Sequence, residues 1–264
     1  MDLPLTHHLQ SLRASGRKGL AILIDPDKAD SADVLRLLDQ ASACRADYLF
    51  IGGSLLSNLE IQRLVPLIKA HTQIPVILFP GSAYQIVAEA DAILFLSLIS
   101  GRNADLLIGR HVEAAPLLRH SGLEVIPTGY LLIESGRLTT VNYITQTLPI
   151  PADKPDIAVS TALAGEMMGM RLIYLDGGSG AEYAIRSEMI RAVAGGIGVP
   201  LVVGGGIRSA DEAERIWRAG ADVIVIGSAL ERDPAGSLMQ EIAARRHEFK
   251  TPSAPGNLNT GDRL

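Results

Sequence analysis

The feature that most constrains the fold is a regular alternation of strand-length apolar runs with amphipathic segments of helical spacing. Eight such runs occur along the 264 residues. Parallel strands buried on both faces are almost continuously apolar and need a crossover between them, so the alternation predicts repeated βα units and a closed, single-domain (β/α)8 TIM barrel. The expected strands are LAILID (20–25), YLFIGG (48–53), PVILFP (75–80), AILFLS (92–97), EVIPTGY (124–130), RLIYLD (171–176), PLVVGG (200–205) and DVIVIGS (222–228).

Two connections depart from a regular barrel. Residues 81–91, between the third and fourth strands, are too few for a full helix with two loops, so we expect the helix after the third strand to be short or replaced by a loop. The long stretch 131–170 is expected to carry two helices. The barrel domain is expected over 1–250, and the polar tail 251–264 is expected to be disordered.

Composition and charge exclude several classes of protein. Hydrophobic residues at 47% and charged residues at 20% suit a large buried core rather than a disordered chain. The net charge of −5, with scattered basic residues, argues against a nucleic-acid partner. The sequence has no signal peptide and no apolar run of about 18 residues, which predicts a cytoplasmic protein without a transmembrane segment. Cys44 is the only cysteine, so internal disulfides and cysteine-built metal sites are excluded.

Three strand exits late in the chain are rich in glycine and serine. They are YLDGGSG (174–180), GGGI (204–207) and IGSAL (226–230). Glycine lets backbone N–H groups approach an anion closely, and a following helix N-terminus adds partial positive charge. One such turn can equally serve tight backbone geometry. Three on adjacent strands predict a phosphate site at the C-terminal end of the barrel, where such enzymes carry their active sites.

Carboxylates stand at two strand exits. Asp25 ends the first strand, and a carboxylate there is a hard oxygen ligand that suits Mg²⁺ shared with substrate phosphates. Ser54 follows the second strand, where it either adds a metal ligand or caps the next helix. Asp27 and Lys28 are interpreted as capping the following helix or pairing with each other. Asp176 shares a strand face with Tyr174, and could orient or deprotonate a substrate hydroxyl or only hold a loop.

Other chemistries find little support. None of the six histidines lies at a strand exit, which disfavours a histidine-built zinc or iron centre. Lys28 is the only lysine near a strand C-terminus, which disfavours Schiff-base aldolase chemistry.

The exits of the fourth and fifth strands are apolar. Such residues either line a groove for an apolar substrate, next to the flank left open by the missing helix, or pack against one another or a second subunit. They are Leu96, Leu98, Ile99, Tyr130, Leu131 and Leu132.

Together these motifs resemble the geranylgeranylglyceryl phosphate synthase family, from Lys18 to about Arg232. The motifs that carry the resemblance, in family order, are ILIDPDK, FIGGSLL, LFPGS, SLISGRNADLLIG, IPTGYLLIESG, YLDGGSGA, VVGGGIRS and VIVIGSAL. The long form SGRNADLLIGRHVEAAP is similar to the archaeal and Bacteroidetes-type group.

The resemblance implies a prenyltransferase of ether-type phospholipid biosynthesis. The enzyme would move a geranylgeranyl or other long prenyl group from its diphosphate to the C3 hydroxyl of sn-glycerol 1-phosphate, with Mg²⁺ held by Asp25 and Ser54. Tyr174 and Asp176 are the candidate catalytic residues, and many members carry Glu at the position of Asp176. A homo-oligomer, dimer or hexamer, is expected. The implied glycerol phosphate contacts are Tyr174, Leu175, Asp176, Gly177, Gly178, Ser179, Gly180, Gly204, Gly205, Gly206, Gly227 and Ser228.

Two alternatives stay open from the residues. A sugar-phosphate isomerase or synthase barrel would share the late phosphate turns, but it predicts an acid and a base at opposite strand exits, and no convincing pair is seen. A non-catalytic phosphometabolite-binding barrel predicts binding of glycerol phosphate without dependence on Mg²⁺ or on prenyl diphosphate.

Overall fold

In the computed structural model, eight parallel strands close into a barrel in sequential order, which confirms the predicted fold. The structure describes residues 3–28, 31–53, 59–233 and 235–249, so the predicted tail 251–264 and Ser54 lie outside the described residues. The strands are β1 (Gly19–Ile24), β2 (Tyr48–Ile51), β3 (Val76–Leu78), β4 (Ala92–Leu98), β5 (Glu124–Leu132), β6 (Leu172–Asp176), β7 (Leu201–Gly204) and β8 (Val223–Ile226).

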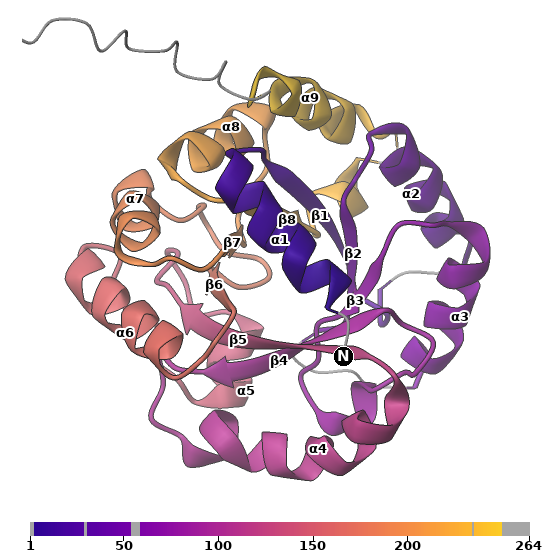
Figure 1. Cartoon of the computed structure of the whole chain (residues 1–264). Coiled ribbons are helices and arrows are strands. Elements are labelled where there is room, and N and C mark those ends of the chain that lie inside the picture. Colours follow the sequence, from indigo (N-terminus) through magenta and orange to yellow (C-terminus); the bar gives the residue numbers. More distant parts are fainter. Residues whose placement is uncertain (1–2, 29–30, 54–58, 234, 250–264) are drawn as a thin grey trace, which may run out of the picture.

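Helices surround the strands (Figure 1). They are α1 (Pro4–Ser15), α2 (Ser31–Ala43), α3 (Ile61–His71), α4 (Arg110–Ser121), α5 (Thr140–Thr145), α6 (Pro155–Met167), α7 (Ser187–Gly196), α8 (Ala210–Ala219) and α9 (Ser237–Arg246). Short helical turns are η1 (Ala83–Gln85), the π-helical η2 (Asp105–Gly109), η3 (Leu230–Arg232) and η4 (His247–Phe249). Both predicted irregularities are confirmed: between β3 and β4 the only helical segment is η1, and the stretch 131–170 holds α5 and α6.

Strand alternation divides the core into two parts. Inward residues such as Phe50, Leu94 and Tyr174 fill the barrel interior in one cluster. Outward residues such as Ile173 and Leu175 pack against the surrounding helices in the other. Because successive side chains point to opposite faces, β6 directs Tyr174 and Asp176 inward together, as the sequence predicted.

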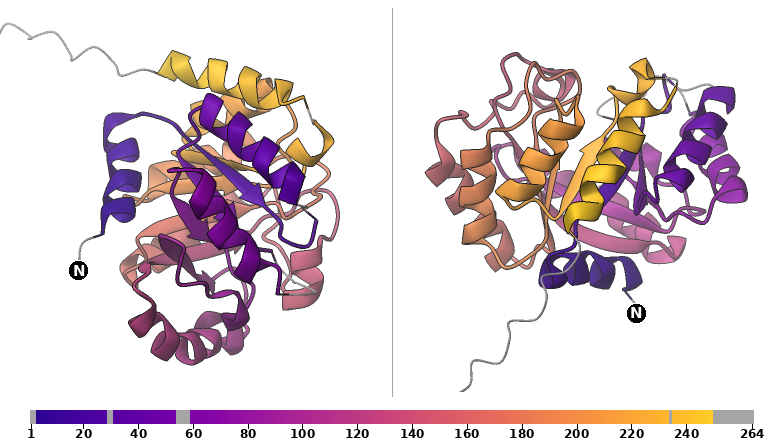
Figure 2. Two further views of the ribbon diagram at one scale, coloured as in Figure 1. Left: turned by 90° about the vertical axis from the view of Figure 1, so that its right-hand side faces the viewer. Right: turned by 90° about the horizontal axis from the view of Figure 1, so that it is seen from above.

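Helix α1 covers the N-terminal end of the barrel (Figures 1 and 2). Its Leu9 and Leu12 pack with the interior cluster. The carboxylate of Glu124, at the start of β5, accepts hydrogen bonds from Leu5 N at 2.9 Å, Thr6 N at 2.7 Å and Thr6 Oγ1 at 2.6 Å. With this end covered, the opposite end, where the strands terminate, is the mouth.

We expect Glu124→Ala to lower the free energy of unfolding by about 3 kcal/mol, because it leaves buried N–H and O–H donors of α1 without an acceptor. Glu124 is 6% exposed, so water cannot replace the lost bonds freely. Urea unfolding measures the effect. Glu113→Ala, which removes only an exposed pair with Arg110, is the control and should change stability by less than about 0.5 kcal/mol. Equal losses in the two variants would contradict the anchoring role.

In the part of the chain that the structure describes, no helix combines the length and the apolar character needed to cross a membrane.

Candidate active site

The turns after β6 and β7 lie against each other at the mouth. Gly177 N donates a hydrogen bond to Gly204 O at 3.0 Å. A Cβ atom on Gly205 would stand 2.8 Å from the nitrogens of both Gly177 and Gly178. Gly205 and Gly206 have φ of +87° and +74°, a left-handed conformation that side chains disfavour. Two main-chain segments therefore approach so closely that only glycine is accommodated between them.

The turn after β8 brings the third predicted segment beside the first strand. In the barrel β8 pairs with β7 on one side and with β1 on the other. A Cβ atom on Gly227 would meet Leu23 of β1 at 3.3 Å, and Ser228 follows directly. The exits of β6, β7, β8 and β1 thus form one continuous arc of the mouth.

Helix dipoles contribute less to this arc than the sequence suggested. After β6, residues 177–186 intervene before α7 begins, and β8 is followed by the short turn η3. Only α8 starts within a few residues of its strand's glycines. Any favourable potential for an anion in this arc comes mainly from individual backbone N–H groups.

Asp176 is held rigidly at the end of β6. Its side chain is buried, Oδ1 accepts a hydrogen bond from Gly178 N at 2.7 Å, and Oδ2 accepts one from the hydroxyl of Tyr130. Burial raises the pKa of Asp176 above its ordinary value, while the two hydrogen bonds oppose the rise. A carboxylate with a raised pKa and both oxygens oriented is suited to accept a proton.

Tyr130, whose hydroxyl bonds this carboxylate, is one of three aromatic rings that pack together. The rings of Phe79 and Tyr174 are stacked, with centroids 5.3 Å apart and planes at 6°. Tyr130 stands edge-on to both, at 5.9 Å from Phe79 and 5.5 Å from Tyr174. Burial raises the pKa of both tyrosines well above the usual value, so their hydroxyls stay protonated at neutral pH and act as donors.

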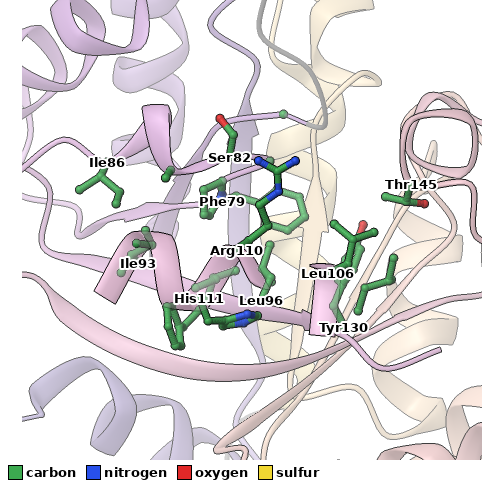
Figure 3. Close-up of a pocket in the computed structure, with 18 of the residues that line it drawn as sticks. Phe79, Ser82, Ile86, Ile93, Leu96, Leu106, Arg110, His111, Tyr130 and Thr145 are labelled. Carbon is green, nitrogen blue, oxygen red and sulfur yellow. The ribbon is translucent and has the colours of Figure 1, made fainter. Parts of the chain in front are cut away.

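An apolar cavity opens from these rings toward the flank between η1 and α4, which a full helix after β3 would otherwise cover (Figure 3). Phe79 and Tyr130 line its inner part, and Arg110 lines it with a side chain that is half exposed and paired with Asp105 at 3.1 Å. The apolar residues of the wall include Ile86, Ile93, Leu94, Leu96, Leu98, Leu106, Val141 and Ile144.

The apolar residues at the exits of β4 and β5 divide between the wall of this cavity and the packed core. Leu96, Leu98 and Tyr130 line the cavity. Ile99, Leu131 and Leu132 are instead buried in the two hydrophobic clusters.

Asp25 stands at the β1 exit, directly after the strand, with its side chain 24% exposed. Its Oδ2 lies 2.9 Å from Lys28 Nζ, and the same ammonium lies 3.7 Å from Glu231 Oε1. Asp25, Glu231 and Gly227 line one cavity. The Lys28 ammonium lies between the carboxylates of Asp25 and Glu231, so the environment at the β1 exit favours a cation.

A Mg²⁺ site here would rest on few protein ligands. Among the described residues, no group of three His, Cys, Asp or Glu side chains is arranged to hold a metal. Mg²⁺ is commonly held by one or two carboxylates plus substrate phosphates and water, so Asp25 suits such an ion when a diphosphate supplies the remaining oxygens.

Sequence reasoning did not assign Phe79 to the site, and it placed Tyr130 only among the apolar strand exits, without its hydrogen bond to Asp176. Tyr130 pairs in register with Tyr174, and Leu132 pairs with Asp176. Because paired residues on neighbouring strands point to the same face, the side chain of Tyr130 points into the barrel as that of Tyr174 does. The approach of Phe79, which comes from across the barrel, depends on how the sheet closes and leaves no pattern in the local sequence.

Comparison with known proteins gives consistent matches. The sequence pattern that defines the PcrB family matches residues 15–246. The geranylgeranylglyceryl phosphate synthase of Spirosoma linguale is 49% identical over 241 residues, covering 91% of this chain and 96% of that protein. The protein of the same name from Korarchaeum cryptofilum is 41% identical over 233 residues, covering 88% and 96%.

The crystal structure of (S)-3-O-geranylgeranylglyceryl phosphate synthase from Thermoplasma acidophilum, in complex with substrate sn-glycerol-1-phosphate, superposes with a TM-score of 0.85. It is 33% identical, and the match covers 91% of this chain and 98% of that one. Thiamine phosphate pyrophosphorylase from Pyrococcus furiosus, at 14% identity and a TM-score of 0.57, shares the fold alone.

Proposed function

Because the chain belongs to the PcrB family, we propose that it transfers a geranylgeranyl group from its diphosphate to the C3 hydroxyl of sn-glycerol 1-phosphate, a step of ether-type phospholipid synthesis. The observation that carries the proposal is the junction at Phe79 and Tyr130. Both rings line the apolar cavity. The Tyr130 hydroxyl also bonds the buried carboxylate of Asp176, and Phe79 stacks on Tyr174. An apolar tail and a polar acceptor could thus meet at one point.

The glycine turns are proposed to hold the phosphate of the acceptor. Segment 174–180, Gly204 to Gly206, and the pair Gly227 and Ser228 lie along one arc of the mouth. Because Gly177 N and Gly178 N already donate to Gly204 O and Asp176 Oδ1, backbone N–H groups of the other residues in these segments would bind the phosphate oxygens. The adjacent β6 exit would direct the C3 hydroxyl toward Asp176.

Asp176 is proposed as the group that takes the proton. The C3 oxygen forms a bond to the first carbon of the prenyl group as the bond from that carbon to the diphosphate oxygen breaks, and the hydroxyl proton passes to Asp176. The products are the prenyl ether and diphosphate. The hydroxyl of Tyr174 lies against Gly204, beside the proposed phosphate site, where it would help to position the acceptor.

The apolar cavity is proposed to hold the prenyl tail. Each buried CH₂ contributes about 0.8 kcal/mol, so a geranylgeranyl chain obtains much of its affinity from this wall. Binding energy from the tail then holds the reacting carbon near the acceptor.

Mg²⁺ is proposed at the β1 exit, with Asp25 and Ser54 as its protein ligands and diphosphate oxygens completing the shell. A bound ion would supply positive charge that stabilises the departing diphosphate. Asp25 would anchor the ion, and Lys28 would remain close enough to contribute a second positive charge.

Product formation tests the proposal. The purified protein should convert sn-glycerol 1-phosphate and geranylgeranyl diphosphate into the prenyl ether, detected by mass spectrometry, with turnover lost on chelation and restored by Mg²⁺. The enantiomer sn-glycerol 3-phosphate is the matched control and should react far more slowly. Binding of glycerol phosphate with no product under any metal condition would favour the non-catalytic barrel instead.

We expect Gly205→Ala to raise the KM for sn-glycerol 1-phosphate by about a hundredfold. The added Cβ would stand 2.8 Å from two backbone nitrogens at a residue with φ of +87°, so the turns must separate. Initial-rate kinetics measure the change. Gly195→Ala, at a position with nothing within 4 Å of the new Cβ, is the control and should leave KM unchanged. An unaltered KM in Gly205→Ala would remove this turn from the phosphate site.

A homo-oligomer, dimer or hexamer, is also proposed. Several large apolar side chains outside the cavity are highly exposed, among them Leu138, Tyr143 and Leu148, and an interface between copies would cover them. Light scattering after size-exclusion chromatography tests this, and a monomeric mass would overturn it.

A further inference from the structure

Tyr130 belongs to two parts of the site at once. Its ring lines the apolar cavity and stands edge-on to Phe79. Its hydroxyl donates a hydrogen bond to Asp176 Oδ2. Among the described residues that line the cavity, it is the one that also bonds to this carboxylate.

The two hydrogen bonds to Asp176 differ in how their donor groups are positioned. The donor on Oδ1 is Gly178 N, a backbone group placed by the turn after β6. The donor on Oδ2 is a side chain whose position depends on the packing of its ring. Because rotation of the carboxylate is fixed only when both oxygens are bound, the orientation of Asp176 depends on Tyr130.

The rings extend this dependence to the cavity. Phe79 contacts Tyr130 edge-on and stacks on Tyr174, so the three rings form one packed unit at the inner end of the cavity. An apolar chain in the cavity would pack against the rings of Phe79 and Tyr130, which line it.

We propose that Tyr130 is a positioning residue that orients the Asp176 carboxylate for proton transfer and couples this orientation to occupancy of the tail cavity. The inference rests on the proposed function. Tyr130 would have two roles: its ring forms part of the inner wall of the tail cavity, and its hydroxyl orients the Asp176 carboxylate. Tyr130→Phe separates these roles because it keeps the ring and removes the hydroxyl.

The expected result for Tyr130→Phe is a kcat lower by about 10- to 100-fold, with a KM for geranylgeranyl diphosphate within about twofold of the wild type. Tyr130→Leu should lower kcat similarly and also raise this KM, because the cavity wall is lost.

The pH profile of Tyr130→Phe has a definite sign. The hydrogen bond from Tyr130 stabilises the charged carboxylate and so lowers the pKa of Asp176; its removal raises that pKa further above the ordinary value. Since the base must be deprotonated, the acid limb of kcat/KM should move to higher pH. The titratable groups that act on Asp176 within the described residues are Tyr130 from β5 and Tyr174 from β6, and Tyr174 is retained in the variant.

Tyr48→Phe is the matched control. Tyr48 is also a buried, inward-facing tyrosine of the barrel, and its hydroxyl bonds His8 at 2.7 Å in the end of the barrel covered by α1. Loss of this hydroxyl removes a buried hydrogen bond of comparable kind but should leave the acid limb and kcat unchanged. Circular dichroism and thermal unfolding of each variant show whether the fold is retained.

A double-mutant cycle with Asp176→Asn completes the test. If Tyr130 acts through Asp176, Tyr130→Phe lowers the residual turnover of Asp176→Asn by less than about twofold. An unshifted acid limb in Tyr130→Phe, or full additivity in the cycle, overturns the inference while wild-type turnover still supports the proposed function. Absence of product with the wild type would count against the proposed function itself.

Discussion

Replacing Asp176 with asparagine is expected to lower kcat by about a hundredfold to ten-thousandfold, the contribution that a positioned general base typically makes. Asparagine keeps the shape and an acceptor oxygen for the Gly178 N–H, but it cannot take the hydroxyl proton. The Kd for sn-glycerol 1-phosphate should change only a few-fold, because the phosphate is held by other groups. Single-turnover rates with labelled acceptor and calorimetry of acceptor binding measure the two quantities.

Asp176→Glu is the informative companion. The family that the sequence resembles often carries Glu at this position, so the longer acid should retain turnover within about tenfold of the wild type. If Asp176→Asn instead kept more than a tenth of wild-type turnover, Asp176 would be a loop anchor, and the proton would have to leave by another route.

Asp25→Ala is expected to lower turnover by at least about a hundredfold and to raise the Mg²⁺ concentration at which the remaining rate is half-maximal. Asp25 is the carboxylate at the β1 exit, and it lines the same cavity as Gly227. Loss of a protein ligand leaves the ion held mainly by the substrate and water. Turnover measured across a Mg²⁺ titration gives both effects.

Lys28→Met separates metal binding from the ion pair. If the only task of Asp25 were to hold the Lys28 ammonium, 2.9 Å away, the two variants would be equally impaired and would share one Mg²⁺ dependence. We expect only Asp25→Ala to change the Mg²⁺ concentration at half-maximal rate upward. An unchanged Mg²⁺ titration in Asp25→Ala would remove this residue from the metal site.

Much of the fold was predictable from local pattern. Each strand is short, apolar and followed by a turn signal, and β1 to β8 were located to within a few residues for that reason. The reduced helix after β3 followed from counting residues 81–91, and η1 confirms it. The inward direction of Tyr174 and Asp176 followed from strand alternation alone.

The rest of the site depends on contacts between segments distant in sequence. Tyr130 is 46 positions before Asp176, and its hydrogen bond exists because β5 and β6 pair in register. Phe79 reaches the same point from β3, on the other side of the closed sheet. Lys28 illustrates a different limit: the spacing suggested capping or pairing with Asp27, whereas the salt bridges join it to Asp25 and to Glu231, which follows β8. Charge pairs of this kind are set by the three-dimensional neighbours of a side chain rather than by its neighbours in the chain.

A crystal structure with sn-glycerol 1-phosphate bound, without the second substrate, is the most direct test of the convergence of the late turns on one anion. We expect the phosphate within hydrogen-bonding distance of backbone nitrogens from Ser179 or Gly180, from Gly205 or Gly206, and from Gly227 or Ser228, with the C3 hydroxyl directed at Asp176. Phosphate density elsewhere on the barrel, or a C3 hydroxyl pointing away from Asp176, would contradict the proposed site.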